Sequence, residues 1–185
     1  MSMDTPMDTP LSLLVLGGCR SGKSRFAEEW VAARYPRRTF LATMARSDDQ
    51  EMARRIALHR QRRTAGWRTV EEPLDLVGAL RREEGQGDVV LIDCLTLWLT
   101  NLLLHELTDS EIEGAVADLA QGVAAAKLPV VLVANEVGLG LVPESPLGRR
   151  FRDLAGWTNQ QMAAVCSHVV LVSAGLPLAL KGTLP

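Results

Sequence analysis

The amino-acid sequence predicts an α/β fold with a mostly parallel sheet that carries helices on both faces. Three observations lead to this fold class. Short apolar runs recur along the chain, segments with helical spacing of apolar residues separate them, and a glycine-rich motif follows the first run. Runs that are apolar nearly throughout are typical of strands buried on both faces, and strands that alternate with helices form parallel sheets.

The expected strands are rich in valine, leucine and isoleucine and are short. They are Leu11–Leu16, Thr39–Thr43, Asp88–Asp93, Pro129–Asn135 and His168–Ser173. The segments between them place apolar residues three and four positions apart, as Phe26 and Trp30 do in the first, which predicts helices. These helices are expected at 24–34, 48–63, 74–84, 95–106, 110–127 and 149–165. Glycines and prolines crowd Gly138–Gly148, which is therefore expected to be a loop.

The length of 185 residues suits one domain. We expect residues 1–10 to be a disordered N-terminal tail and residues 11–185 to form a single domain. The tail repeats Met-Asp-Thr-Pro and has neither the basic start nor the apolar centre of a secretory signal.

Charge and cysteine usage exclude several classes of protein. A formal net charge of −2 argues against a general nucleic-acid binder. The longest apolar stretch, Leu95–Leu104, is interrupted by polar residues and is too short to span a membrane. Cys19, Cys94 and Cys166 lie far apart, which suggests neither a zinc site nor a disulfide framework and favours the reducing cytoplasm.

The glycine-rich motif matches G-x-x-x-x-G-K-[ST] at every fixed position. It predicts a P-loop and hence a P-loop NTPase-like fold, in which backbone N–H groups surround phosphate oxygens, Lys23 neutralises the outer phosphates and the Ser24 hydroxyl binds Mg²⁺. The alternative is a glycine turn with an exposed lysine. The motif residues are Gly17, Gly18, Cys19, Arg20, Ser21, Gly22, Lys23 and Ser24.

Asp93 ends an apolar strand and is the candidate acid for the magnesium ion of a P-loop enzyme. Any buried strand that ends in aspartate would show the same pattern. Ligands of open α/β sheets bind beyond the carboxyl ends of the strands, so the P-loop, Asp93, the Asn135-Glu136 pair and Gly138–Gly148 are expected at one edge of the sheet. Glu136 is either a general base for a substrate hydroxyl or a cap for the adjoining turn.

His59 is the candidate nucleophile. On a helix, Glu51 and Arg55 lie eight and four residues before it, and six arginines crowd residues 54–68. Positive neighbours disfavour protonation of an imidazole, and they also attract a triphosphate and stabilise charge on a phosphorus centre under attack. The alternative is a solvated basic helix with an incidental histidine. His105, His168 and the tryptophans are interpreted as structural.

Longer stretches resemble the bifunctional adenosylcobinamide kinase / adenosylcobinamide-phosphate guanylyltransferase family of cobalamin biosynthesis. They are GGCRSGKS, EMARRIALHRQRR, GWRTVEEP, VVLIDCLTLWLTNLL, VVLVANEVGLGLVPESPLGRRFRDLAGWTNQ and LVSAGLPLALKG. The resemblance covers about residues 12 to 182. It implies a homotrimer that phosphorylates adenosylcobinamide with ATP or GTP and then transfers GMP from GTP to that phosphate through a guanylylated histidine, with Mg²⁺ as the metal.

The resemblance also implies site residues. His59 matches the histidine that carries GMP, and some family members have two consecutive histidines where this chain has Leu58-His59. Asp93 matches the acidic position at a strand end, and the family's P-loop falls on Gly17 to Ser24. The remaining nucleotide contacts match Thr43, Met44, Ala45, Arg60, Gln61, Arg62, Arg63 and Glu71.

Two other functions compete with this interpretation. A simple P-loop kinase would transfer only the γ-phosphoryl group and would form no covalent intermediate. A nucleotide-dependent switch protein would act on a partner protein and would form no product on cobinamide.

Overall fold

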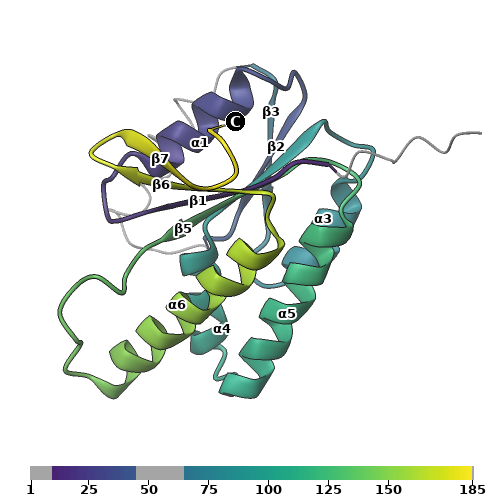
Figure 1. Cartoon of the computed structure of the whole chain (residues 1–185). Helices are drawn as coiled ribbons and strands as arrows, with labels where there is room; N and C mark the ends of the chain where they lie inside the picture. Colours follow the sequence, from purple (N-terminus) through teal and green to yellow (C-terminus); the bar gives the residue numbers. More distant parts are fainter. Residues whose placement is uncertain (1–9, 45–64, 185) are drawn as a thin grey trace, which may run out of the picture.

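The computed structural model describes residues 10–44 and 65–184. These residues form a seven-stranded sheet in the order β3-β2-β4-β5-β1-β6-β7 (Figure 1). Six strands run parallel to their neighbours, and only β7 pairs antiparallel, with β6. The strands are β1 (Ser12–Gly17), β2 (Arg38–Ala42), β3 (Trp67–Glu71), β4 (Val89–Asp93), β5 (Val130–Asn135), β6 (His168–Ser173) and β7 (Leu176–Lys181).

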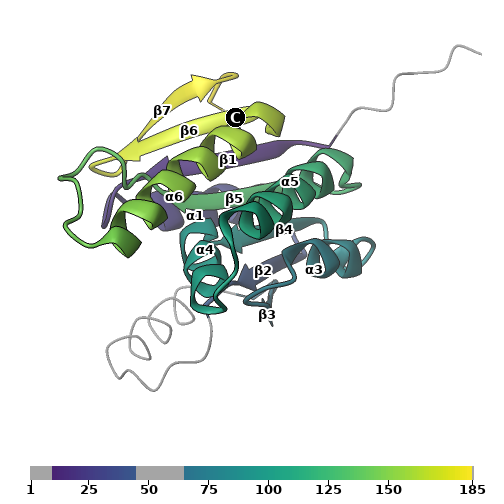
Figure 2. The same cartoon turned by 90° about the horizontal axis from the view of Figure 1, so that it is seen from below.

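Helices cover both faces of the sheet. The helix α1 lies on one face and the others lie on the opposite face, as Figures 1 and 2 show. The helices are α1 (Lys23–Ala32), α3 (Leu76–Glu83), α4 (Leu95–Leu104), α5 (Asp109–Ala125) and α6 (Pro146–Val165). Among the described residues, no helix is both long enough and apolar enough to cross a membrane.

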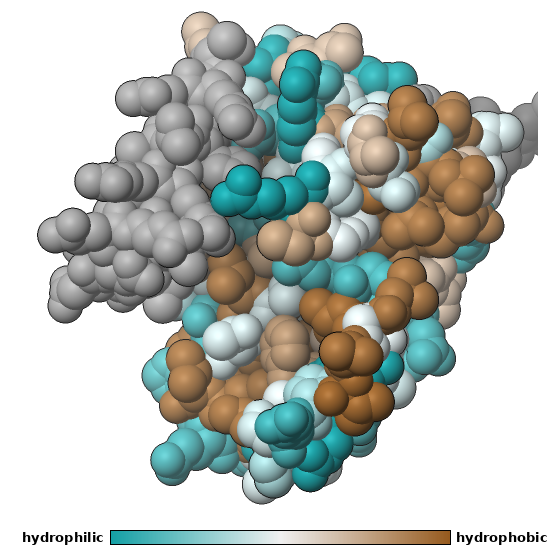
Figure 3. Space-filling model, turned by 90° about the vertical axis from the view of Figure 1, so that its left-hand side faces the viewer, coloured by the Kyte–Doolittle hydropathy of each residue, from teal (hydrophilic) through white to brown (hydrophobic). Residues whose placement is uncertain are grey.

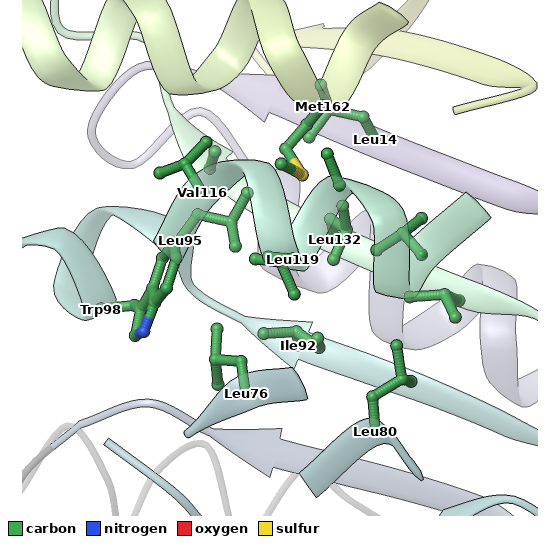
Figure 4. Packing of buried hydrophobic residues seen from close by; sticks show 14 of the residues in the cluster. Leu14, Leu76, Leu80, Ile92, Leu95, Trp98, Val116, Leu119, Leu132 and Met162 are labelled. Atoms are coloured by element: carbon green, nitrogen blue, oxygen red, sulfur yellow. The ribbon is translucent and has the colours of Figure 1, made fainter. Parts of the chain in front are cut away.

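Alternate residues of each central strand belong to two separate hydrophobic cores, one on each face of the sheet. Leu14, Ile92 and Leu132 point toward α3 to α6 and pack against Leu95, Leu119 and Met162 (Figure 4). Their sequence neighbours, such as Leu13 and Val131, pack against α1 on the other face. Because both faces are buried, the central strands contain apolar residues at nearly every position.

The five expected strands and the five described helices are confirmed, with boundary differences of up to three residues. The helix expected at 48–63 lies outside the described residues. The largest boundary difference is at α6, which begins at Pro146 rather than near 149, because Ser145 accepts a hydrogen bond from the Gly148 N–H and proline suits the first helical turn. The start of α6 therefore occupies part of the expected loop.

The tryptophans fill the interior, as expected. Trp98 is 2% exposed and donates from Nε1 to the Leu74 carbonyl oxygen at 2.9 Å. Trp67 packs edge-on against Phe40, and the half-buried Trp157 packs against the larger core. Their role is therefore structural.

Candidate nucleotide site

The glycine-rich motif forms a tight loop between β1 and α1. Gly17 is the last residue of β1 and Lys23 is the first of α1. The loop turns through positive φ at Arg20 (55°) and Gly22 (97°), and the Ser21 N–H donates to the Gly18 carbonyl oxygen at 3.2 Å. No side chain of the described residues caps the N-terminus of α1. The positive end of that helix therefore faces the loop, as in an anion-binding site.

Lys23 and Ser24 are the first two residues of α1 and adjoin the loop. The Lys23 ammonium donates to the Gly18 carbonyl oxygen at 3.2 Å, so it lies across the mouth of the loop. Ser24 is half-buried in the first turn of α1. Cys19 and Arg20 are exposed and contribute backbone to the turn. All eight residues of the motif lie in this strand, loop and helix.

The strand register brings the other predicted positions to the same edge of the sheet. Gly17 lies beside Asn135, and Asp93 lies between Ala42 and Val133. The Glu136 N–H donates to the Gly17 carbonyl oxygen at 3.1 Å. Because these strands are parallel, their carboxyl ends meet there. The prediction that the P-loop, Asp93 and Asn135-Glu136 share one edge is confirmed.

The charges of Asp93 and Lys23 both act on the buried Cys94 thiol. Its pKa is raised to about 11, chiefly by burial and also by the adjacent Asp93 carboxylate, and the Lys23 ammonium opposes the rise. An aspartate and a lysine close together at a P-loop are the charges that a magnesium-bound triphosphate requires.

Thr43 ties the end of β2 to the start of α4. Its buried hydroxyl accepts from the Cys94 N–H at 2.9 Å and donates to the Cys94 carbonyl oxygen at 2.8 Å. The Thr43 carbonyl oxygen accepts from Asn101 Nδ2 at 2.7 Å. Met44 follows and is half-buried. Thr43 therefore positions the backbone after Asp93.

Glu71 is exposed at the end of β3 and pairs in register with Ala42 of β2. It lies at the same edge of the sheet as Asp93, two strands away. His59, Arg60, Gln61, Arg62, Arg63 and Ala45 lie outside the described residues. The structure therefore does not bear on the predicted nucleophile or its basic neighbours.

Glu136 supports the capping interpretation that the sequence left open. Its Oε1 accepts from the Gly138 N–H at 2.8 Å, which closes the first turn of the segment after β5. His105 is exposed at the end of α4, and His168 is half-buried beside Ser167, with 3.0 Å between Nδ1 and Oγ. His168 begins β6 and pairs with Leu13, so it lies at the opposite edge of the sheet from the P-loop.

Sequence reasoning missed the side chains that join β5 to its neighbouring helices. Thr96 Oγ1 accepts from the Asn135 N–H at 2.7 Å, and Asn159 Nδ2 donates to the Asn135 carbonyl oxygen at 3.2 Å. Asn135 Oδ1 is buried and has no hydrogen-bond partner among the described residues. These contacts join residues far apart in the chain, so no local pattern indicates them.

The turn between β6 and β7 contacts the P-loop. Sequence reasoning missed this contact as well. The Gly175 N–H donates to the Ser21 carbonyl oxygen at 2.8 Å. A Cβ added at Gly22 would lie 3.2 Å from the Gly175 Cα. Ala174 and Gly175 both have positive φ, as in a tight hairpin turn. The glycine between two apolar runs was a usable signal for a turn, because glycine adopts positive φ without steric cost.

Two curated bacterial proteins resemble the chain over nearly its whole length. The bifunctional adenosylcobalamin biosynthesis protein CobP of Pseudomonas aeruginosa is 49% identical over 174 residues, which cover 91% of this chain and 96% of that protein. The bifunctional adenosylcobalamin biosynthesis protein CobU of Escherichia coli K12 is 39% identical over 183 residues, which cover 92% of this chain and 100% of that protein.

Solved structures support the fold. The assembled ATPase EscN of the enteropathogenic E. coli type III secretion system superposes with a TM-score of 0.55 at 11% identity. The match covers 90% of this chain and 43% of that one, and it shows a shared P-loop NTPase fold alone.

The family model described as "Cobinamide kinase / cobinamide phosphate guanyltransferase" matches residues 13–180. With the near full-length relatives, this match shows that the chain belongs to the cobinamide kinase / cobinamide phosphate guanyltransferase family.

Proposed function

We propose that both activities named by the family use one nucleotide site at the carboxyl edge of the sheet. The chain phosphorylates adenosylcobinamide with ATP or GTP and transfers GMP from GTP to the resulting phosphate, which yields adenosylcobinamide-GDP. The observation that carries this proposal is that the P-loop, with Lys23, and the end of β4, with Asp93, lie at one edge of the sheet. The rival interpretation as a switch protein predicts neither activity in the family's name.

The kinase reaction is a direct displacement. The substrate hydroxyl oxygen attacks the γ-phosphorus, the bond to the β–γ bridging oxygen breaks, the nucleoside diphosphate leaves and the hydroxyl proton passes to solvent. The loop amides and Lys23 stabilise the charge that moves onto the bridging oxygen. The N-terminus of α1 adds its positive end to the same region.

The guanylyl transfer uses two displacements. A neutral nitrogen of His59 attacks the α-phosphorus of GTP and forms a P–N bond, while the bond to pyrophosphate breaks. A phosphate oxygen of adenosylcobinamide phosphate then attacks the same phosphorus and releases the histidine. Two inversions give net retention of configuration at phosphorus. His59 and the stretch Arg60 to Arg63 enter this proposal through the family resemblance and the charge pattern of the sequence.

The metal in this proposal is Mg²⁺. Among the described residues, no three His, Cys, Asp or Glu side chains gather as a metal cluster. Ser24 and Asp93 would hold the Mg²⁺, which proteins usually bind through one or two side chains together with substrate phosphates and water. The ion would supply positive charge to the phosphates.

The proposal also covers further nucleotide contacts, the oligomeric state and the cellular compartment. Glu71, Thr43, Met44 and Ala45 contribute nucleotide contacts beside the P-loop. Three copies of the chain assemble into a homotrimer, to which the exposed leucines of β7 add apolar surface. A cytoplasmic setting suits the three cysteines, which are all free thiols.

Covalent labelling tests the proposal. After incubation with GTP labelled at the α-phosphate, the protein should retain a label that is stable in alkali and lost in acid, as expected for a phosphoramidate. His59→Ala should retain no label and should still transfer the γ-phosphoryl group to cobinamide. His105→Ala is the matched control and should label fully, because His105 is exposed at the end of α4. Lys23→Ala should lose both activities.

The simple kinase is the rival that this experiment separates. It predicts product on cobinamide and no label on the wild-type protein. Equal labelling of His59→Ala and the wild type would place the intermediate on another residue and overturn the assignment of His59.

A further inference from the structure

We propose that the segment Leu139–Leu147, here called the apolar loop, is the surface on which the corrin ring of the substrate rests. This inference rests on the proposed function, since it concerns the corrinoid of that same site. The apolar loop follows β5, and Figure 3 views the molecule from the side on which the strands end and shows hydrophobic surface there.

The apolar loop exposes large hydrophobic side chains that a protein normally buries. Leu139 is 88% exposed, Leu141 97%, Val142 66% and Leu147 57%. The apolar loop contains one charged residue, Glu144. Soluble proteins rarely expose several large apolar side chains together, and where they do, the surface usually binds a ligand or a partner.

The apolar loop is held in place from α6. Arg149 Nη1 donates to the Glu144 carbonyl oxygen at 2.5 Å and to that of Pro143 at 3.1 Å. Arg152 Nη2 donates to the Gly138 carbonyl oxygen at 2.6 Å, just before the apolar loop begins. Both guanidinium groups therefore fix backbone and leave the apolar side chains outward. A surface held in advance loses less conformational entropy when a ligand binds.

The apolar loop begins beside the phosphate cradle. Glu136, three residues before Leu139, donates its N–H to the Gly17 carbonyl oxygen at the start of the P-loop. A substrate whose hydroxyl reaches the γ-phosphate must keep its ring system outside this narrow cradle. A corrin is a broad, largely apolar ring system with neutral amide arms, which suits an uncharged apolar surface next to the cradle.

A second copy of the chain is the other conceivable occupant. Two other exposed leucines favour a different place for that contact, because Leu176 (72% exposed) and Leu178 (59%) lie on the edge strand β7. An edge strand is a usual site for pairing between chains. The apolar loop instead follows a central strand, whose carboxyl end is where ligands of open α/β sheets bind.

The test is the double variant Leu139→Ser/Leu141→Ser. The KM for cobinamide in the kinase reaction should rise at least tenfold, while the KM for ATP changes less than twofold. Labelling with α-labelled GTP should equal that of the wild type, because this half-reaction does not involve the corrinoid. The mass measured by light scattering should also be unchanged. Leu104→Ser is the matched control, since Leu104 is 73% exposed at the end of α4 and should keep the wild-type KM for cobinamide.

The outcomes separate the possibilities. An unchanged KM for cobinamide in the double variant overturns the inference, and so does a changed mass, which would make the apolar loop a contact between subunits. An equal rise in KM in Leu104→Ser also overturns it, because the effect would then be a general response to lost apolar surface. If the wild-type protein forms no product on cobinamide, the proposed function fails before the variants are compared.

Discussion

Gly17 and Gly18 are neighbours, yet an added side chain would meet very different surroundings at the two positions. A Cβ at Gly17 would lie 2.4 Å from Ser21 Oγ and 2.6 Å from the Val172 carbonyl oxygen. A Cβ at Gly18 would have no neighbour within 4 Å among the described residues. Gly17 is therefore required where β6 passes the P-loop, whereas Gly18 is not required for packing.

We predict that Gly17→Ala lowers the free energy of unfolding by about 1–3 kcal/mol. The new Cβ would meet the backbone oxygen of Val172, so β6 itself would have to shift. Gly18→Ala should change it by less than about 0.5 kcal/mol. Urea unfolding of both variants beside the wild type is the measurement. Equal losses in the two variants would show that β6 does not limit the space at Gly17.

Cys166 should make the protein sensitive to alkali. Burial raises the pKa of its thiol from 9.0 to about 12. Below pH 9 the thiol is protonated in both states and has no effect. Above pH 9 it ionises only in the unfolded chain, so stability falls until the pH reaches the folded value.

Between pH 8 and pH 10 this thiol alone should remove about 1 kcal/mol from the free energy of unfolding. Cys166→Ala should be less stable than the wild type at pH 8 because of the lost side chain, and should lose about 1 kcal/mol less between the two values. Urea unfolding at both pH values measures the difference. Parallel losses in the two proteins would show that the thiol ionises equally in both states.

At the scale of elements, one threonine hydroxyl joins β2, β4 and α4. Thr43 pairs with both backbone groups of Cys94, and Asn101 of α4 holds the Thr43 carbonyl oxygen. Thr43→Val keeps the shape and leaves the buried Cys94 N–H without its partner, while the Cys94 carbonyl oxygen still accepts from the Trp98 N–H. The substitution should lower the free energy of unfolding by about 1–3 kcal/mol and weaken nucleotide binding, because Asp93 precedes the released backbone.

Thr43→Ser is the matched control because it keeps the hydroxyl and loses one methyl group. It should cost about 0.8 kcal/mol or less and should leave nucleotide affinity unchanged. Unfolding in urea and titration with GTP measure the two effects. If valine and serine have the same effect on GTP affinity, the hydrogen bonds of Thr43 do not position the site.

Two strands were missing from the sequence prediction for a common physical reason. β3 (WRTVE) and β7 (LPLALK) are the two edges of the sheet, and each exposes at least one face. Edge strands do not need the continuous apolar run by which the central strands were found. Pro177 lies in β7, and an edge strand tolerates proline whereas a central strand does not.

At the scale of the whole molecule, we propose that apolar side chains on the edge strand β7 form the contact between copies of the chain. Leu176 and Leu178 alternate along β7, point to one face and are largely exposed. We predict a three-chain mass by light scattering for the wild type and a single-chain mass for Leu178→Glu, because a charge would be buried in the contact.

Leu104→Glu controls for the general effect of a new surface charge, since Leu104 is also exposed and lies at the end of α4. It should keep the three-chain mass. A single-chain mass for the wild type would contradict the trimer, and a three-chain mass for Leu178→Glu would place the interface elsewhere.

The sequence by itself determined the layered α/β fold, the P-loop, the strand-end acid and the family. These features are local, because the periodicity of a segment reflects the faces it buries and a phosphate cradle is built within eight consecutive residues. Only the tertiary structure decided which elements brace that cradle. The contacts of Gly175 with Ser21, of Thr43 with Cys94 and of Thr96 with Asn135 join separate elements. They depend on strand order and register, which no local pattern of residues specifies.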